Sequence, residues 1–420
     1  MVENVEGGKL LFNGLTRSIV FMTDLEYSEM FSNIDKYLYL YKYYFIVPKD
    51  FNEIETIDKV KNHFRTPIDD VYLNHPTGYT ILTTTKCNAR CFYCYELKSK
   101  KANMSQDTAK KVAEYIIKHS YRNNPIKLAW FGGEPLFNMK VIDTITLMLR
   151  DAGLNFYSDF TTNGYLFDQD LIIKAKNSWN ISSVQITIDG TEQVYNKAKN
   201  YIYKNGESPY KRVINNIKML LRENITVTIR LNLDSYNCDN LKQLVDELYT
   251  IFGNNPNLNI YCWPIFENSD YQRTDAQRAF VFKELEEIEN IIKSYGYLIG
   301  TVPNNMIAHT QCMADNGKHI TISPNGELGV CEHCVDYDFW GNINSEEKDI
   351  DIFKSWRQYE PVLDICKDCP IYGSCIRLSK CEEMSKCDPY YKEWKLRKAR
   401  WGLQSFYKRI QNYECNNIAK

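Results

Sequence analysis

The sequence has little net charge, few histidines and no long apolar run. Its 420 residues include 51 Lys and Arg against 53 Asp and Glu, a formal net charge of −2, so no basic field favours nucleic acid. No apolar run reaches the roughly 18 residues that a membrane span needs. Residues 1–6 lack the basic start and apolar stretch of a signal peptide. We therefore expect a soluble, cytoplasmic protein whose partners include neither a nucleic acid nor a membrane.

Histidine is scarce, but cysteine is abundant and unevenly placed. The chain has 14 cysteines and only 6 histidines. Residues 1–86 contain none, 87–94 contain three, 95–311 contain two and 312–415 contain nine. In a reducing compartment such clustering indicates metal binding rather than disulfides. Because histidine is too scarce for mixed Cys/His zinc sites to explain the whole set, we expect thiolate-rich iron–sulfur sites.

Three of the cysteines stand close together within residues 85–95. Cys87, Cys91 and Cys94 have the spacing C-x₃-C-x₂-C, and Tyr93 directly precedes the third. Three thiolates on one short loop can hold three irons of a [4Fe–4S] cube and leave the fourth iron open to an outside ligand. An open iron favours chemistry over a scaffolding role.

Between about residues 79 and 297 the apolar pattern alternates between strand and helix. Amphipathic stretches separate the apolar runs, and the first begins after Ser105, a predicted helix N-cap. Such βα units predict a parallel α/β layer, either a partial barrel or a doubly wound sheet, with a site at the carboxyl ends of its strands. The cysteine loop follows the first strand and so falls at that end. The predicted strands are 79–85, 126–131, 156–162, 183–189, 225–233 and 258–266.

A second motif, Gly132-Gly133-Glu134-Pro135, follows the second predicted strand. Two glycines allow a ligand to approach the backbone, and the glutamate can accept a hydrogen bond from an ammonium group. Together with the cysteine loop, this motif resembles the radical S-adenosylmethionine (SAM) enzymes. The resemblance implies a partial (β/α)6 TIM-type barrel in which SAM chelates the open iron and is cleaved on reduction to a 5′-deoxyadenosyl radical. It also implies that Gly132, Gly133 and Glu134 hold the methionine ammonium and that Tyr93 lies near the adenine.

Polar residues on three later strands extend the expected SAM site. Asn163 follows the third strand, Thr187 lies at the end of the fourth, and Arg230 lies in the fifth. Hydroxyl, amide and guanidinium groups suit a ribose and a carboxylate. We expect all three residues to contact SAM. The alternatives are an ordinary β-branched strand residue at Thr187 and a structural ion pair at Arg230.

The C-terminal cysteines follow a pattern of their own. Cys312 is followed by thirteen residues, Gly326, four residues and Cys331, and the cysteines of 366–387 have the spacing C-x₂-C-x₅-C-x₅-C-x₅-C. This closely resembles the SPASM extension of radical SAM peptide-modifying enzymes, which carries two auxiliary iron–sulfur clusters. One spacing departs, because five residues precede Cys381 where the family has three.

The resemblance implies that these ligands serve two clusters. The outer cluster is expected on Cys366, Cys369, Cys375 and Cys387, and the inner cluster on Cys312, Cys331 and Cys381. The fourth ligand of the inner cluster is either Cys334 or an open position for a substrate thiolate. The alternative for the later cysteines is a structural zinc site. We expect Cys238 and Cys262 to be buried thiols rather than ligands.

Residues 1–78 contain no cysteine and precede the predicted barrel. We predict helices near 25–36 and 51–64, and a strand in the alternating tyrosines of 37–47. This small mixed α/β unit resembles the N-terminal extensions of SPASM peptide maturases. An exposed edge strand could capture a peptide by β-augmentation, and the alternative is a cap packed on the barrel.

These patterns predict a radical SAM/SPASM enzyme that modifies a ribosomally made precursor peptide. We expect an N-terminal α/β domain at 1–78, a radical SAM domain at 79–300 and a cysteine-rich SPASM domain at 301–420. The expected reaction is hydrogen abstraction followed by a thioether or other cross-link, with an electron donor such as flavodoxin or ferredoxin. The alternatives are sulfatase-maturase-type oxidation of a Cys or Ser side chain in a protein and an iron–sulfur electron carrier without turnover. No general base can be named from the sequence.

Overall fold

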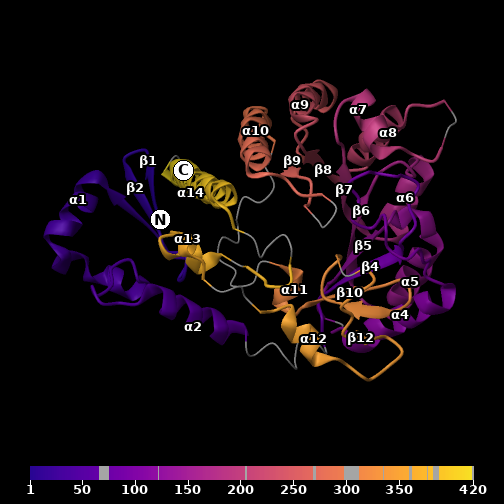
Figure 1. Ribbon diagram of the computed structural model, residues 1–420, viewed down its shortest axis with the longest axis horizontal. Helices are drawn as coiled ribbons and strands as arrows, with labels where there is room; N and C mark the ends of the chain where they lie inside the picture. Colours follow the sequence, from indigo (N-terminus) through magenta and orange to yellow (C-terminus); the bar gives the residue numbers. More distant parts are fainter. Residues whose placement is uncertain are drawn as a thin grey trace. The chain divides into compact units, whose positions relative to one another are not determined.

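The computed structural model divides the chain into two compact units (Figure 1). The central unit comprises Ile68–Gly300 and Cys312–Gln358, and the terminal unit comprises Met1–Pro67, Thr301–Gln311 and Tyr359–Lys420. The described residues are 1–65, 75–121, 123–203, 206–267, 271–297, 312–333, 335–358, 362–375, 377–381 and 387–418.

The central unit is built on a nine-stranded sheet in which strands β4 to β9 pair in parallel. Strands β4 to β9 are hydrogen-bonded to one another in chain order, without the reversal that defines a doubly wound sheet. All six predicted strands are confirmed as strands. They are β4 (Gly78–Thr84), β5 (Ile126–Gly132), β6 (Phe156–Thr162), β7 (Ile181–Thr187), β8 (Thr226–Leu233) and β9 (Leu258–Pro264).

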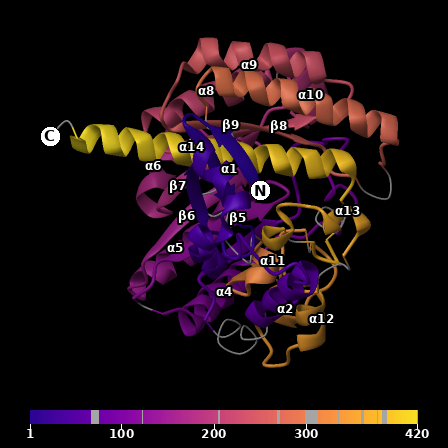
Figure 2. The same ribbon diagram turned by 90° about the vertical axis from the view of Figure 1, so that its left-hand side faces the viewer.

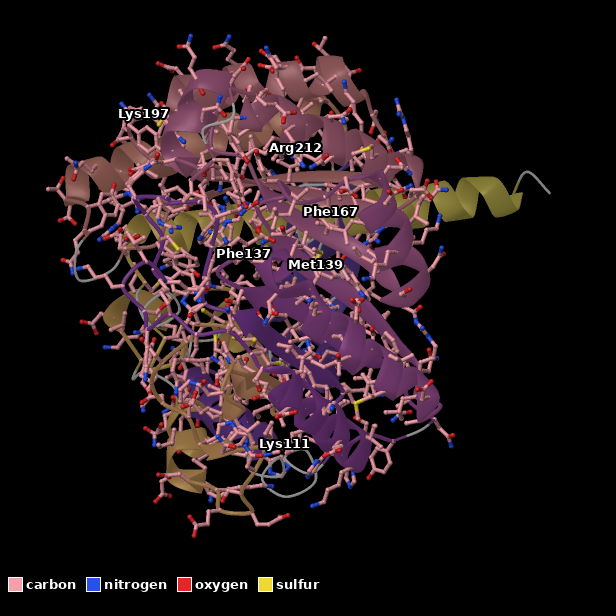
Figure 3. The ribbon with its side chains drawn as sticks, turned by 90° about the vertical axis from the view of Figure 1, so that its right-hand side faces the viewer. Lys111, Phe137, Met139, Phe167, Lys197 and Arg212 are labelled. Carbon is pink, nitrogen blue, oxygen red and sulfur yellow. The ribbon has the colours of Figure 1, made fainter. Side chains whose placement is uncertain are left out.

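Amphipathic helices follow these strands and form an outer layer around them (Figure 1). Ser105 caps α4 as predicted, since its side chain accepts a hydrogen bond from a backbone N–H of the first turn. The helix buries Ala109 and Ile116 toward the sheet, while Lys111 faces solvent (Figure 3). The helices are α4 (Gln106–His119), η3 (Pro135–Asn138), α5 (Met139–Asp151), α6 (Gln169–Ser178), α7 (Glu192–Lys199), α8 (Pro209–Arg222), α9 (Cys238–Phe252) and α10 (Asp275–Ser294).

The segment 312–358 extends the same sheet. Its first strand, β10, pairs in parallel with β4. His319 fits this junction closely: its Nε2 lies 2.7 Å from Thr80 Oγ1, and its Nδ1 lies 2.3 Å from where a Cβ on Gly78 would be. The elements of the segment are α11 (Met313–Asn316), β10 (His319–Ile322), β11 (Glu327–Gly329), β12 (Gly341–Asn342) and α12 (Ile350–Ser355).

The N-terminal part of the terminal unit is a three-stranded antiparallel sheet followed by helices. The predicted helices are confirmed near their expected positions, and the first begins with a capping box between Thr23 and Glu26. The prediction of a strand at 37–47 is wrong, because residues 37–43 belong to a 3₁₀ helix and no strand follows in 44–47. Tyr37 and Leu40, three residues apart, are buried in one apolar cluster, so the burial period is three and not two. The elements are β1 (Val2–Val5), β2 (Gly8–Phe12), β3 (Ile19–Thr23), α1 (Asp24–Ser32), η1 (Ile34–Tyr43) and α2 (Glu53–Arg65).

The C-terminal elements pack on this N-terminal sheet within the terminal unit (Figure 2). Leu403 is buried against Leu10 and Phe12, and the rings of Tyr407 and Phe21 stack with centroids 5.6 Å apart. The segment predicted as one C-terminal domain, 301–420, is therefore divided between the two units. Its last elements are α13 (Asp364–Lys367), η4 (Tyr372–Ser374) and α14 (Pro389–Ile418). Among the described residues, no helix has both the length and the hydropathy to cross a membrane.

Candidate active site

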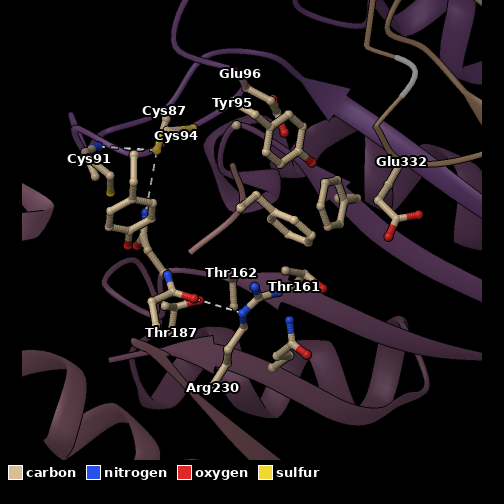
Figure 4. A pocket seen from close by; sticks show the side chains of 18 of the residues that line it. Cys87, Cys91, Cys94, Tyr95, Glu96, Thr161, Thr162, Thr187, Arg230 and Glu332 are labelled. Carbon is tan, nitrogen blue, oxygen red and sulfur yellow. Dashed lines mark hydrogen bonds between the residues drawn. The ribbon is translucent and has the colours of Figure 1, made fainter. Parts of the chain in front are cut away.

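A cavity of about 440 Å³ opens at the carboxyl ends of the parallel strands, as expected for such a layer (Figure 4). The strand ends β5 to β9 form one part of its wall, and the loops after β4 and β11 form the rest. Six of the seven predicted SAM contacts line it. The lining includes Cys87, Cys91, Tyr93, Cys94, Tyr95, Glu96, Gly132, Gly133, Thr161, Thr162, Asn163, Gln185, Thr187, Lys199, Arg230, Asn232, Tyr261, Phe266, Glu332 and His333.

The cysteine loop brings its three thiols to this cavity. The backbone N–H of Ala89 donates to Cys87 Sγ at 3.3 Å, and N–H donors of this kind stabilise thiolate ligands. Burial raises the pKa of Cys87 to about 12 and that of Cys94 to about 11, so iron binding must displace their protons.

The donor set fits a cluster better than a single ion. Within the described ranges, no three His, Cys, Asp or Glu side chains converge tightly enough to hold one metal ion. An iron–sulfur cube needs a wider arrangement, because each thiolate binds a different iron. Cys87, Cys91 and Cys94 have the residue type, the common loop and the access to the cavity that such a cube requires.

Close packing of the backbone leaves no room for a side chain at Gly132 or Gly133. Gly132 has φ +120°, and a Cβ on it would lie 2.1 Å from the carbonyl oxygen of Thr84. A Cβ on Gly133 would lie 2.4 Å from the carbonyl oxygen of Lys86. The glycines therefore let the end of β5 touch the start of the cysteine loop, in addition to lining the cavity.

Glu134 is turned away from the cavity. It is wholly buried, and its carboxylate accepts hydrogen bonds from Thr162 Oγ1 at 2.7 Å and from the backbone N–H of Asn163 at 2.8 Å. Burial raises the pKa of Glu134 to about 7. In this structure the residue ties the end of β5 to the end of β6, and its contact with the SAM ammonium stays a prediction.

The other predicted contacts reach the cavity from successive strand ends. Asn163 and Thr187 line it from β6 and β7, and Arg230 lines it from β8. The Arg230 guanidinium donates to Asn232 Oδ1 at 2.9 Å and lies over the ring of Phe266. No carboxylate pairs with Arg230 among the described residues, so the alternative of a structural ion pair finds no support there.

A buried ion pair beneath the cysteine loop was not predicted. Lys199 Nζ lies 3.1 Å from Asp189 Oδ2 and donates to the hydroxyl of Tyr93 at 3.0 Å, and that hydroxyl donates to Asp189 at 2.9 Å. Burial lowers the pKa of Lys199, but the charge of Asp189 outweighs it and holds the pKa well above its usual value. A backbone hydrogen bond also links the cysteine loop to the end of α7, because the N–H of Arg90 donates to the carbonyl of Lys199 at 2.8 Å.

The far side of the cavity is acidic. Glu96 and Glu332 line it together with Tyr95, whose ring stacks on His333 with centroids 4.5 Å apart. Burial raises the pKa of Glu96 to about 7, against the opposing influence of the Lys101 ammonium. The segment after β11 therefore contributes to the same cavity as the cysteine loop.

The predicted auxiliary ligands are distributed over both units. Cys312 and Cys331 lie in the central unit, whereas Cys366, Cys369, Cys375, Cys381 and Cys387 lie in the terminal unit, and all seven are free of disulfides. Lys395 Nζ donates to Cys375 Sγ at 3.4 Å. Cys334 lies outside the described residues. Cys238 and Cys262 are buried as predicted, at 3% and 2% exposure.

A three-cysteine loop at the mouth of a parallel α/β layer is the arrangement expected of enzymes that hold an iron–sulfur cluster on such a loop. The profile of the Radical SAM superfamily matches residues 81–248. This segment is thus a radical SAM domain, and the superfamily implies SAM and one [4Fe–4S] cluster as cofactors.

Three known proteins illustrate the similarity. An uncharacterized protein of Methanocaldococcus jannaschii is 23% identical over 272 residues, which cover 63% of this chain and 88% of that protein. The structure of anSMEcpe with bound SAM has a TM-score of 0.59 at 16% identity and covers 80% of this chain and 98% of that chain. Streptococcus suis SuiB bound to its precursor peptide SuiA has a TM-score of 0.55 at 14% identity and covers 93% of this chain and 98% of that chain. At these identities the two structures show the fold alone.

Proposed function

We propose that this protein is a peptide maturase that forms a thioether or another cross-link in a ribosomally made precursor peptide. The observation that carries the proposal is the single cavity onto which the cysteine loop, the strand-end SAM contacts and the loop after β11 all open. SuiB and anSMEcpe, both solved with peptides, support a peptide as substrate. SuiB matches over more of this chain, 93% against 81%, which favours the precursor-peptide reading.

Six side chains of the cavity have assigned roles in this proposal. Cys87, Cys91 and Cys94 hold the cluster, and Asn163 and Thr187 contact the polar groups of SAM. The planar guanidinium of Arg230 suits the SAM carboxylate, because it can donate two parallel hydrogen bonds. When bound, SAM and the cluster supply a 5′-deoxyadenosyl radical, while the protein positions the substrate and excludes water. We further infer that the parallel layer is a partial (β/α)6 barrel.

The later cysteines are proposed to hold two auxiliary clusters of the SPASM type. The ammonium of Lys395 at Cys375 supports this, because a cation beside a thiolate offsets the negative charge of a cluster. These clusters would accept the second electron or anchor a substrate thiolate, and flavodoxin or ferredoxin would supply the first electron. Residues 1–78 are proposed to take part in peptide recognition.

Formation of 5′-deoxyadenosine tests the proposal. The protein is reconstituted anaerobically, reduced with dithionite and incubated with SAM and with candidate cysteine-rich precursor peptides. We expect 5′-deoxyadenosine and a peptide that has lost two hydrogens per new bond. Cys87→Ala should abolish both, whereas Cys238→Ala, a buried thiol away from the cavity, should preserve them. An iron-loaded, reducible protein that forms no 5′-deoxyadenosine with or without peptide would instead support an electron carrier.

A further inference from the structure

The cavity has an acidic end that none of the predicted SAM contacts forms. Glu96, on the loop after β4, and Glu332, on the loop after β11, line this end together with Tyr95. Figure 4 shows these three side chains across the cavity from Arg230 and Thr187. The cavity therefore has a basic side and an acidic side.

The burial of Glu96 distinguishes this acidic end from a cluster of surface carboxylates. It is only 4% exposed, and its Oε2 has no hydrogen-bond partner within the part of the chain that the structure describes. Lys101 is close, but its ammonium donates at 2.6 Å to the backbone carbonyl of Glu96. The buried hydroxyl of Tyr95 also has no partner among the described residues. Buried polar atoms are nearly always hydrogen-bonded, so these two point to a ligand.

The charges and rings of this end select the kind of ligand. A neutral donor would leave Glu96 and Glu332 as two carboxylates in one confined space, whereas a cation offsets both. Tyr95 and Phe266 both contact the ring of His333, with centroids 4.5 and 5.0 Å away. Aromatic faces of this kind suit the methylene stem of a lysine or arginine side chain and attract its cationic head.

We propose that Glu96, assisted by Glu332, binds a lysine or arginine side chain of the substrate peptide. This inference rests on the proposed function, because its ligand is part of the peptide. It assigns to the acidic end a specificity-determining role and no part in hydrogen abstraction. The ammonium group of SAM and an internal hydrogen bond between Tyr95 and Glu96 are the two competing partners for the carboxylate.

Binding of synthetic peptides to the reconstituted, SAM-loaded full chain tests the inference. The probes are acetyl-Gly-Ser-Gly-X-Gly-Ser-Gly-amides in which X is lysine, arginine, norleucine or glutamine, and calorimetry measures their affinities. We expect the lysine and arginine peptides to bind about tenfold more tightly than the norleucine peptide. Glu96→Gln should lower this ratio to about one, and Glu332→Gln should lower it less. Glu114→Gln, on the exposed face of α4, is the matched control and should leave the ratio unchanged.

Every result decides the question. Equal affinity for lysine and norleucine, no measurable binding of the lysine peptide, or a ratio that survives Glu96→Gln would overturn the inference. A loss of SAM affinity in Glu96→Gln would assign the carboxylate to SAM instead, and an unchanged SAM affinity shows that the variant site is intact. Binding needs no turnover: charge selectivity without 5′-deoxyadenosine refutes only the proposed function, and 5′-deoxyadenosine without charge selectivity refutes only this inference.

Discussion

At the scale of single residues, Lys199 is a buried cation that contacts the cysteine loop through the hydroxyl of Tyr93. Its ammonium and the Asp189 carboxylate are 5% and 0% exposed, so neither charge is solvated. Lys199→Met leaves Asp189 buried without its cation, and we expect the free energy of unfolding of the central unit to fall by about 3 kcal/mol. Urea unfolding of the cluster-free protein measures this loss.

The double variant Lys199→Met/Asp189→Asn separates the charge effect from lost packing. Replacing both charged groups removes the unpaired carboxylate, so we expect the double variant to recover at least half of the stability lost by the single one. If the two substitutions instead destabilise additively, the contribution comes from packing and not from the ion pair.

Individual residues of the site differ in how far their positions could be predicted from the sequence. The cysteine triad and the strand-end residues Asn163, Thr187 and Arg230 could be predicted to meet at one cavity, because strand ends of a parallel layer share one edge. Lys199 could not be predicted, since it lies at the end of α7 and acquires its role only through tertiary contacts. The orientation of the Glu134 side chain could not be predicted either, because the motif does not specify which neighbouring groups donate hydrogen bonds to its carboxylate.

At the scale of elements, the junction between β4 and β10 depends on the absence of a side chain. A Cβ on Gly78 would lie 2.3 Å from His319 Nδ1. Gly78→Ala should therefore destabilise the central unit by about 2 kcal/mol, the usual cost of overpacking. Adding His319→Ala should relieve the clash, so that the double variant loses less than the two single losses combined. A double variant that shows the full additive loss in thermal unfolding would contradict this account.

His319 also gives this junction a dependence on pH. Burial lowers the pKa of its imidazole to about 4, against 6.5 for the unfolded chain. Between these values the unfolded state binds a proton that the folded state does not, so stability is fully present above pH 6.5 and is lost as the pH falls toward 4. We expect the free energy of unfolding to fall by about 2 kcal/mol more between pH 7 and 5 in the wild type than in His319→Asn. Parallel urea titrations that show the same pH slope for both proteins would exclude His319 as the source.

Periodicity explains which elements could be predicted. Several of the strands β4 to β9 alternate buried with less buried residues, as β9 does, and this period of two favours a strand over a helix. Residues 37–47 misled the prediction because their tyrosines alternate. Tyr39, Tyr41 and Tyr43 are exposed, and the residues that pack, Tyr37 and Leu40, follow a period of three.

At the scale of the molecule, the cysteine field is divided by packing that the sequence does not reveal. Residues 312–358 join the central unit through strand pairing with β4, while the segment with Cys366 to Cys387 joins the N-terminal sheet in the terminal unit. Lys61 illustrates the second contact, because its ammonium donates to the backbone carbonyls of Tyr372 and Cys375 at 2.7 and 3.0 Å. Spacing alone groups cysteines by their order in the chain and cannot anticipate pairings across more than 300 residues.

Because Cys87, Cys91 and Cys94 lie in the central unit and Cys366, Cys369 and Cys375 lie in the terminal unit, the cluster on each of these sets should be lost independently of the other. With three [4Fe–4S] clusters, the reconstituted wild type should hold about 12 irons and 12 sulfides per chain. Replacing Cys87, Cys91 and Cys94 by alanine should leave about 8 of each, and so should replacing Cys366, Cys369 and Cys375. Cys238→Ala is the control and should lose none. Iron, zinc and acid-labile sulfide are measured on the same samples, because a zinc site contains no sulfide. A wild type with about 4 irons, 4 sulfides and one zinc per chain would replace the proposed auxiliary clusters with a structural zinc module.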